Sequence, residues 1–162
     1  MIKLKELHNL PVISMGNGAL VGEVKDILIS DDGENIEGLI IVQNDNFFVP
    51  GEYIYCLGDD IVIIKSGENL ILLEDKKNKI NYAKNKEIIL GNSVINTSGK
   101  ELGVISDLLI DEKLGKIVGY ELSGGVIQDL WEGRNFLTVE ENLYYGQDVV
   151  IVGGDKLFEE QK

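Results

Sequence analysis

An internal repeat is the feature that most constrains the fold of this chain. A shift of 81 positions brings residues of the first half onto the same residue types in the second half, namely Gly22 on Gly103, Asp26 on Asp107 and Gly38 on Gly119. The match runs without a gap from Lys3 to Val42. Matched glycines carry particular weight, because glycine marks backbone that turns sharply or packs closely. The sequence therefore predicts two copies of one module.

Beyond Val42 the matching shift grows to 88 positions, which places Gly58 on Gly146 and Asp60 on Asp148. The second copy therefore contains seven additional residues, near positions 123–135. The predicted organisation is a first domain at 1–65, a linker at 66–81, a second domain at 82–155 and a C-terminal tail at 156–162.

Each copy is predicted to consist of short strands separated by turns. β-Branched residues alternate with turn signals such as Gly16-Asn17-Gly18, Asp31–Asn35 and Gly58-Asp59-Asp60. In the first copy the predicted strands are 11–14, 21–30, 36–43, 47–49 and 61–65. This spacing predicts an all-β fold of two tandem small β-barrels, in which closure removes the exposed strand edges.

Two further elements are predicted outside this repeated pattern. Apolar residues in the inserted segment have helical spacing between flanking glycines, so one short helix is expected in the second barrel. Leu70–Leu73 in the linker could add one more strand.

Charge limits the class of partner. The 162 residues include 15 basic and 28 acidic side chains, a net charge of −13. Phosphate affinity comes from Lys and Arg, so direct nucleic-acid binding is disfavoured, and anionic membrane is disfavoured for the same reason. We expect a protein partner, and a basic protein would be electrostatically compatible with this chain. Formation of homo-oligomers is also possible.

The compartment is predicted from what the sequence lacks. Cys56 is the single cysteine, so an intrachain disulfide is ruled out, which fits a reducing compartment. The N-terminal residues lack the apolar run of a signal peptide, and no stretch reaches the length of a membrane span. We therefore expect a cytoplasmic protein.

The repeated motifs resemble the PRC-barrel family. LPVISMGNGALVGEVKDILISDDGENIEGLIIV looks like the opening of that domain, and FFVPGEYIYCLGDDIVII looks like its closing segment. The second copy repeats both, with Thr138 in the position of Pro50. The resemblance implies a tandem PRC-barrel protein with about six strands per barrel. The family also includes the cytoplasmic domain of the reaction-centre H subunit and the C-terminal domain of a ribosome-maturation factor of the RimM type, which share docking onto larger assemblies.

Catalytic, metal and cofactor sites are not predicted. His8 is the single histidine, and no cysteine or second histidine lies near it. The acidic residues Asp31, Asp32 and Glu34 do not have the order of an EF-hand loop, and turn formation explains them. We therefore predict a protein that is not an enzyme, with no catalytic residues, metal or cofactor.

Asp26 and Asp107 recur inside strands, between aliphatic neighbours. They could form a paired carboxylate site, but we favour a structural role in which each accepts backbone hydrogen bonds at a bulge or a barrel corner. The residues assigned to structural turns and bulges are Gly22, Asp26, Gly38, Gly58, Asp60, Gly103, Asp107, Gly119, Gly146 and Asp148.

Trp131 in the inserted segment is the main candidate for partner binding, because tryptophan is enriched at interface hot spots. Capping of the barrel core is the alternative role for this side chain. The full set of partner-binding candidates is Ile127, Leu130, Trp131, Arg134 and Tyr145.

The sequence favours one class of function over two others. The leading hypothesis is a non-catalytic adaptor or scaffold that binds a cytoplasmic protein assembly. The first alternative is an accessory factor in RNA processing or ribosome maturation that acts through a ribosomal protein. The second alternative is a barrel that binds a small molecule or an ion.

Overall fold

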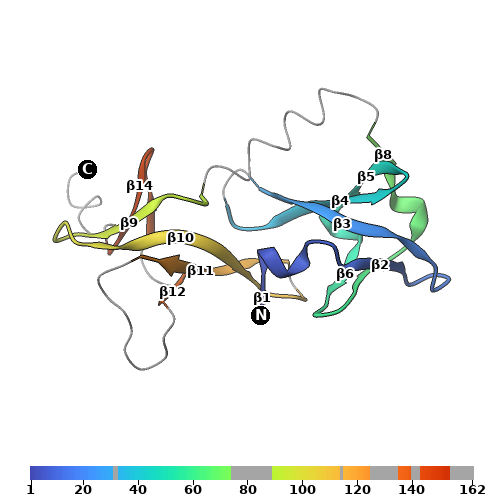
Figure 1. Cartoon of the computed structure of the whole chain (residues 1–162), viewed down its shortest axis with the longest axis horizontal. Helices are drawn as coiled ribbons and strands as arrows, with labels where there is room; N and C mark the ends of the chain where they lie inside the picture. The colour runs from blue at the N-terminus through green and yellow to red at the C-terminus, as the bar shows by residue number, and fades with distance from the viewer. Residues whose placement is uncertain (31–32, 74–88, 114, 125–134, 140–142, 154–162) are drawn as a thin grey trace. The chain divides into compact units, whose positions relative to one another are not determined.

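The computed structural model describes residues 1–30, 33–73, 89–113, 115–124, 135–139 and 143–153 (Figure 1). The chain divides into two compact units. The first comprises Met1–Glu87 together with Ile110–Ile117, and the second comprises Ile88–Leu109 together with Val118–Lys162. The tip of one hairpin of the second repeat, Ile110–Ile117, therefore belongs to the first unit.

The first unit is built on one strongly curved sheet (Figure 1). Its strands are hydrogen-bonded in the order β6-β7-β2-β3-β4-β5-β8, with β2 parallel to β7 and the other pairs antiparallel. The strands of this repeat are β1 (Ile2–Lys3), β2 (Pro11–Ser14), β3 (Leu20–Ile29), β4 (Ile36–Gln43), β5 (Asp45–Pro50), β6 (Ile54–Leu57), β7 (Val62–Ile64) and β8 (Ile71–Leu72).

Three 3₁₀ helices complete the first unit, namely η1 (Leu4–Leu7), η2 (Gly51–Tyr53) and η3 (Gly67–Asn69). The first helix buries Leu4 and Leu7 in the core, which explains why an apolar residue recurs every third position there. The third helix begins where the Ser66 hydroxyl accepts a hydrogen bond from the Glu68 amide. These short 3₁₀ helices form parts of the connections between strands of the first unit.

The second unit repeats this arrangement. Its strands are hydrogen-bonded in the order β12-β11-β10-β9-β14-β13, and β9 is parallel to β14, as β2 is to β7. These strands are β9 (Ser93–Asn96), β10 (Glu101–Ile110), β11 (Ile117–Ser123), β12 (Asn135–Thr138), β13 (Leu143–Tyr145) and β14 (Val149–Val152).

The predicted all-β class is confirmed. The strand expected at 36–43 is present with these bounds, and those expected at 11–14 and 21–30 match within one residue. Among the described residues, the backbone pairing of the first sheet runs from β6 to β8 as a half-barrel, which fits the predicted barrel class. The additional strand expected near Leu70–Leu73 is β8, which pairs with β5. The helix expected in the insertion lies outside the described residues.

Strand register corrects the ungapped alignment of the two repeats. Val12 pairs with Gly22, and Val94 pairs with Gly103. The two first strands are therefore related by a shift of 82 positions, whereas β3 and β10 are related by 81. The turn that follows the first strand is one residue shorter in the second repeat. Sequence matching missed this gap because both turns keep a glycine just before the next strand.

Gly22 and Gly103 both lie beside a β-bulge, where one extra residue interrupts the ladder. Their φ angles, 145° and 149°, fall in a region that residues with a Cβ rarely adopt. A Cβ on Gly22 would also lie 2.5 Å from Ile41 Cγ2 and 2.6 Å from the Val42 oxygen. The backbone angle therefore favours glycine in each repeat, and in the first repeat the adjacent strand also excludes a side chain.

We expect Gly22→Ala to lower the free energy of unfolding by about 2 kcal/mol or more, because strain and steric overlap act together. Gly16→Ala is the matched control, because a Cβ there would have no neighbour closer than 3.8 Å. That variant should stay within about 0.5 kcal/mol of the wild type. Urea unfolding followed by circular dichroism measures both, and equal losses would contradict the steric explanation.

Candidate functional site

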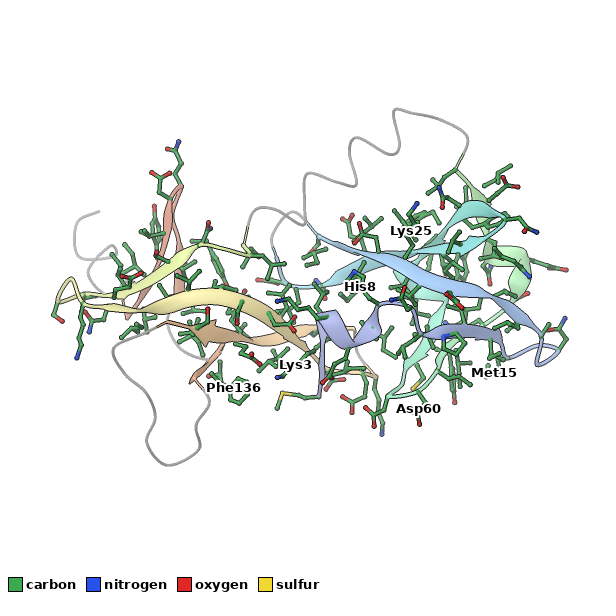
Figure 2. The ribbon with its side chains drawn as sticks, viewed as in Figure 1. Lys3, His8, Met15, Lys25, Asp60 and Phe136 are labelled. Atoms are coloured by element: carbon green, nitrogen blue, oxygen red, sulfur yellow. The ribbon has the colours of Figure 1, made fainter. Side chains whose placement is uncertain are left out.

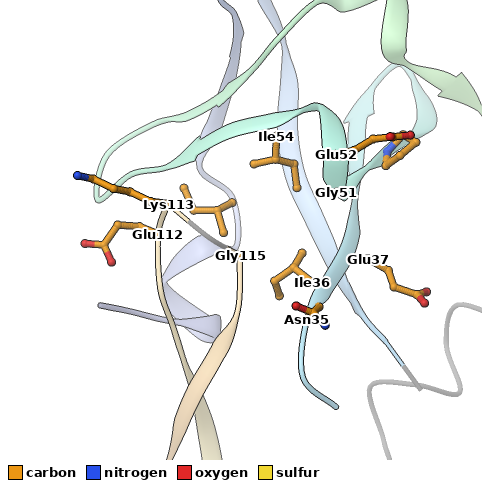
Figure 3. A pocket seen from close by; sticks show the side chains of 11 residues that line it. Asn35, Ile36, Glu37, Gly51, Glu52, Ile54, Glu112, Lys113 and Gly115 are labelled. Atoms are coloured by element: carbon orange, nitrogen blue, oxygen red, sulfur yellow. The ribbon is translucent and has the colours of Figure 1, made fainter. Parts of the chain in front are cut away.

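The candidate site is a cavity of about 430 Å³ within the first unit (Figure 3). Three parts of the chain surround it: the start of β4, the corner from β5 through η2 to β6, and the hairpin tip Ile110–Ile117. Its lining consists of Asn35, Ile36, Glu37, Pro50, Gly51, Glu52, Ile54, Leu57, Glu112, Lys113 and Gly115. Its volume lies in the range typical of small-ligand pockets.

Backbone contacts fix the walls of this cavity. The Ile36 amide donates to the Gly115 oxygen at 2.8 Å, and the Leu57 amide donates to the Glu112 oxygen at 3.2 Å. At the opposite wall, a Cβ on Gly51 would lie 2.6 Å from the Ile36 oxygen, so only glycine allows this close approach. The walls are therefore held mainly by main-chain groups, which leaves the side chains to determine what the cavity can bind.

The cavity has a mixed polar and apolar lining and a charged rim, which we call its mouth. Ile36 and Ile54 point into it, whereas Glu112 and Lys113 point away from it at the hairpin tip (Figure 3). Glu37 and Glu52 lie on the other side of the cavity, and both are exposed and also point away from it. Three carboxylates stand against the ammonium of Lys113 and that of Met1, which lies beside Glu112, so the mouth has a small negative excess. The arrangement suits a ligand with an apolar body and a positive group.

One ion pair adjoins the mouth. The Met1 ammonium lies 2.7 Å from Glu112 Oε2. The hydrogen bond from this ammonium lowers the pKa of the Glu112 carboxyl below its ordinary value, and the same bond raises the pKa of the Met1 amine above 8.0. Both groups are well exposed, so solvent screening limits the contribution of the pair to stability.

The second unit carries a different polar feature. The Tyr120 and Tyr145 hydroxyls are 2.7 Å apart, and their rings meet edge to face with centroids 6.4 Å apart. Tyr120 is fully buried, whereas Tyr145 is 45 % exposed. Register places them at the positions held by Leu39 and Leu57 in the first repeat. The second repeat has thus replaced two buried leucines with a hydrogen-bonded tyrosine pair.

The two recurring aspartates occupy equivalent positions. Asp26 directly follows a register shift in β3, and its Oδ1 accepts a hydrogen bond from the Ile27 amide at 2.8 Å. Asp107 Oδ1 accepts from the Leu108 amide at the same distance, and this residue is buried. The two belong to different compact units. Each carboxylate thus holds its own strand locally.

The remaining structural residues lie at turns and close contacts. A Cβ on Gly38 would lie 2.4 Å from the Val49 oxygen, and one on Gly119 would lie 2.6 Å from the Leu137 oxygen. Equivalent turns end in hydrogen bonds from Gly58 to Ile61 and from Gly146 to Val149. Asp60 and Asp148 are exposed residues of these two turns.

Most of the predicted partner-binding residues lie outside the described residues, namely Ile127, Leu130, Trp131 and Arg134. Tyr145 is described, and its contact with Tyr120 accounts for part of its surface. Cys56 is half-buried. In the described part of the chain, no three His, Cys, Asp or Glu side chains are grouped as metal ligands would be.

The sequence did not predict the cavity. Asp31–Asn35 was interpreted as a turn, and nothing in that segment signals that a second turn meets it. The repeat itself carried a usable signal, because equivalent turns with polar tips can pair with each other.

Comparison with known families identifies the class of protein. The model of the PRC-barrel domain matches the chain twice, over residues 1–71 and 88–158. The chain belongs to the PRC-barrel family, and it is a tandem member. Domains of this family commonly mediate protein interactions or assembly and are generally non-catalytic. No curated protein matches the chain. Within the described residues, no helix has the length and hydropathy of a membrane span.

The Met1–Glu112 pair predicts a measurable titration. Because the amine pKa is raised, its contribution to stability is present below pH 8 and is lost as the pH rises through the raised value. The contribution of Glu112 is lost as the pH falls through its lowered pKa. Glu112→Gln should return the amine pKa toward 8.0. NMR titration of the amine measures this, with Glu37→Gln as a control that leaves it unchanged. If the amine pKa were the same in Glu112→Gln as in the wild type, the ion pair would be refuted.

The tyrosine pair predicts coupling between two positions. Tyr120→Phe and Tyr145→Phe should each lower the free energy of unfolding by about 1 kcal/mol, because each removes the shared hydrogen bond. The double variant should lose clearly less than the sum of the single losses. Urea unfolding of all four proteins measures the coupling energy. Strictly additive losses would show that the two hydroxyls do not interact.

Proposed function

We propose that this protein is a non-catalytic adaptor that binds a cytoplasmic protein assembly through the cavity of its first unit. The observation that supports this function best is a cavity into which the apolar side chains of Ile36 and Ile54 point and whose mouth has a negative excess of charge. Family membership supports the class of function, since PRC-barrel domains commonly act in protein interactions. The cavity adds a specific place at which a partner could insert a side chain.

The charge of the mouth favours a basic partner. Glu37, Glu52 and Glu112 line the opening, and the whole chain carries a net charge of −13. Such a surface accelerates association with a positive segment and disfavours acidic competitors. We therefore propose that a Lys or Arg side chain of the partner lies at the mouth, with its aliphatic portion against Ile36 and Ile54.

Exposed apolar side chains of the first unit could extend this contact. Met15, Leu20 and Tyr55 are more than half exposed, at 51, 57 and 55 %. Met15 directly follows β2 and is the first residue of the turn that leads to β3 (Figure 2). In the second repeat, Trp131 remains the proposed anchor, together with Ile127, Leu130, Arg134 and Tyr145.

Affinity capture from the native cell tests the proposal. We expect the wild-type chain to recover a defined protein partner, and Glu37→Lys/Glu52→Lys to reduce recovery on the order of tenfold, because the charge at the mouth is reversed. The matched control is Glu23→Lys/Glu68→Lys, which makes the same change in net charge at exposed glutamates that do not line the cavity. Trp131→Ala, measured in parallel, tests the second anchor.

The outcomes separate local from general charge effects. Loss only in Glu37→Lys/Glu52→Lys supports the cavity, and loss only in Trp131→Ala assigns binding to the inserted segment. Equal loss in both charge variants would mean that overall acidity, rather than the cavity, attracts the partner. Failure of the wild-type chain to recover any partner would contradict the adaptor function.

The volume of the cavity favours one alternative, the binding of a small molecule. A metabolite with an apolar body and an amine would satisfy the same interior and mouth. Thermal unfolding in the presence of a library of cationic metabolites distinguishes this function. A rise in the melting temperature that Ile54→Asp abolishes would support a small ligand, whereas no shift with any compound would leave the protein partner as the ligand.

A further inference from the structure

Two hairpin tips meet within the first unit, and they do so through main-chain atoms. We define the first tip as Glu34–Ile36 and the second tip as Gly115–Ile117. Asn35 and Lys116 form an antiparallel bridge. On either side of it, the Ile36 amide donates to the Gly115 oxygen at 2.8 Å, and the Ile117 amide donates to the Glu34 oxygen at 2.9 Å.

The two residues at the centre of this contact, Asn35 and Lys116, are counterparts in the two repeats. The 81-position shift that relates β3 to β10 also relates Asn35 to Lys116. It likewise converts the bond from Ile36 to Gly115 into the bond from Ile117 to Glu34. The contact is therefore unchanged when the two tips are exchanged. Contacts with this property form between identical subunits around a two-fold axis, where one patch recognises itself.

The conformation of each hairpin leaves this edge available. Within the hairpins, the Asn35 oxygen accepts from the Ser30 amide and the Lys116 oxygen accepts from the Asp111 amide, at 2.9 and 2.8 Å. The main-chain groups that form hydrogen bonds inside each hairpin are thus equivalent in the two repeats. They differ from the main-chain groups that form hydrogen bonds between the tips. Ile36 and Ile117 are buried, with 7 and 3 % exposure, so both equivalent strands begin in an apolar environment.

We propose that this tip is a self-recognition surface whose ligand is the same tip of another PRC-barrel domain. In the wild-type chain the second tip pairs with the first tip, so the main-chain groups of both tips are hydrogen-bonded within one chain. If the second tip is disabled, the first tip of one chain pairs with the first tip of a second copy. This inference concerns a surface for a second copy of the chain, so it does not depend on the adaptor function.

The charges of the two tips predict that the two possible homotypic contacts differ in strength. A first tip paired with another first tip places the uncharged Asn35 side chains opposite each other, with the Glu34 carboxylates one residue away from the bridge on each strand. A second tip paired with another second tip places Lys116 opposite Lys116, and like charges that face each other destabilise strand pairing. Self-association should therefore be stronger when the first tip is released than when the second is released.

The bridge geometry supplies a chemical probe. The flanking hydrogen bonds make Asn35 and Lys116 a non-hydrogen-bonded pair, for which the Cα atoms of two strands approach to about 4.5 Å. That separation permits a disulfide. In a Cys56→Ser background, Asn35→Cys/Lys116→Cys should form an internal disulfide and remain monomeric on a non-reducing gel. Failure of this disulfide to form would overturn the inference without any disabling variant.

The decisive experiment prevents one tip from pairing. Ile117→Pro removes the amide that donates to Glu34, at the first residue of β11, where proline is tolerated best. In this variant, Asn35→Cys should give at least about ten times more disulfide-linked dimer than Asn35→Cys alone. Ile36→Pro with Lys116→Cys should give less dimer. Ile117→Ala retains the amide and truncates the side chain, so it should not increase cross-linking.

Two controls make the result conclusive. Ser98→Cys, in an exposed turn, reports random collision, and Ile36→Pro/Ile117→Pro disables both tips. The proposal would be overturned if Asn35→Cys/Ile117→Pro formed no more disulfide-linked dimer than Ser98→Cys does. It would also be overturned if disabling both tips did not reduce the amount of dimer. Circular dichroism establishes that each proline variant is folded, and if one is not, the internal disulfide of the native chain decides the question.

Discussion

Backbone hydrogen bonds between two equivalent hairpin tips are the contacts on which the candidate site depends. Ile36 and Gly115 form one of these bonds, and both residues also line the cavity. The adjacent bond from Leu57 to Glu112 holds the same hairpin near the mouth. Main-chain bonds tolerate many side-chain changes, because the donor and acceptor are present in almost every residue. The walls of the cavity therefore depend little on which side chains line it.

Divergence between the repeats indicates where their roles separated. Positions that set the backbone are retained, such as Gly22 and Gly103 beside the bulge. Positions inside the units have changed, and the leucines of the first repeat correspond to Tyr120 and Tyr145 in the second. The two repeats therefore share one backbone scaffold but differ in part of their cores.

Local sequence signals predicted much of the fold. The bounds of β4 and the turns around Gly58 and Gly146 follow from β-branched runs and turn residues, which act through neighbouring positions. The one-residue gap before β10 could not be found in this way, because both turns place a glycine before the next strand. The η1 helix was missed because four residues are too few for a periodic pattern to emerge.

The cavity could not be predicted from the same signals, because it depends on contacts between distant residues. Glu112 and Ile54 are far apart in sequence, and no local pattern connects the hairpin that carries Glu112 with the strand that carries Ile54. Strand pairing through main-chain atoms leaves little trace in side-chain pattern. The repeat was the one guide available, since a self-complementary edge requires two equivalent segments.

The adaptor function and the self-recognition surface both assume that the two tips are paired in solution. Amide hydrogen exchange of the native chain, measured by NMR, tests this directly at Ile36 and Ile117. Pairing predicts that both amides exchange about a hundred times or more slowly than the exposed amide of Asn17, and to a similar degree as each other. Exchange of either amide at the rate of Asn17 would show that the tips are unpaired and would contradict the account.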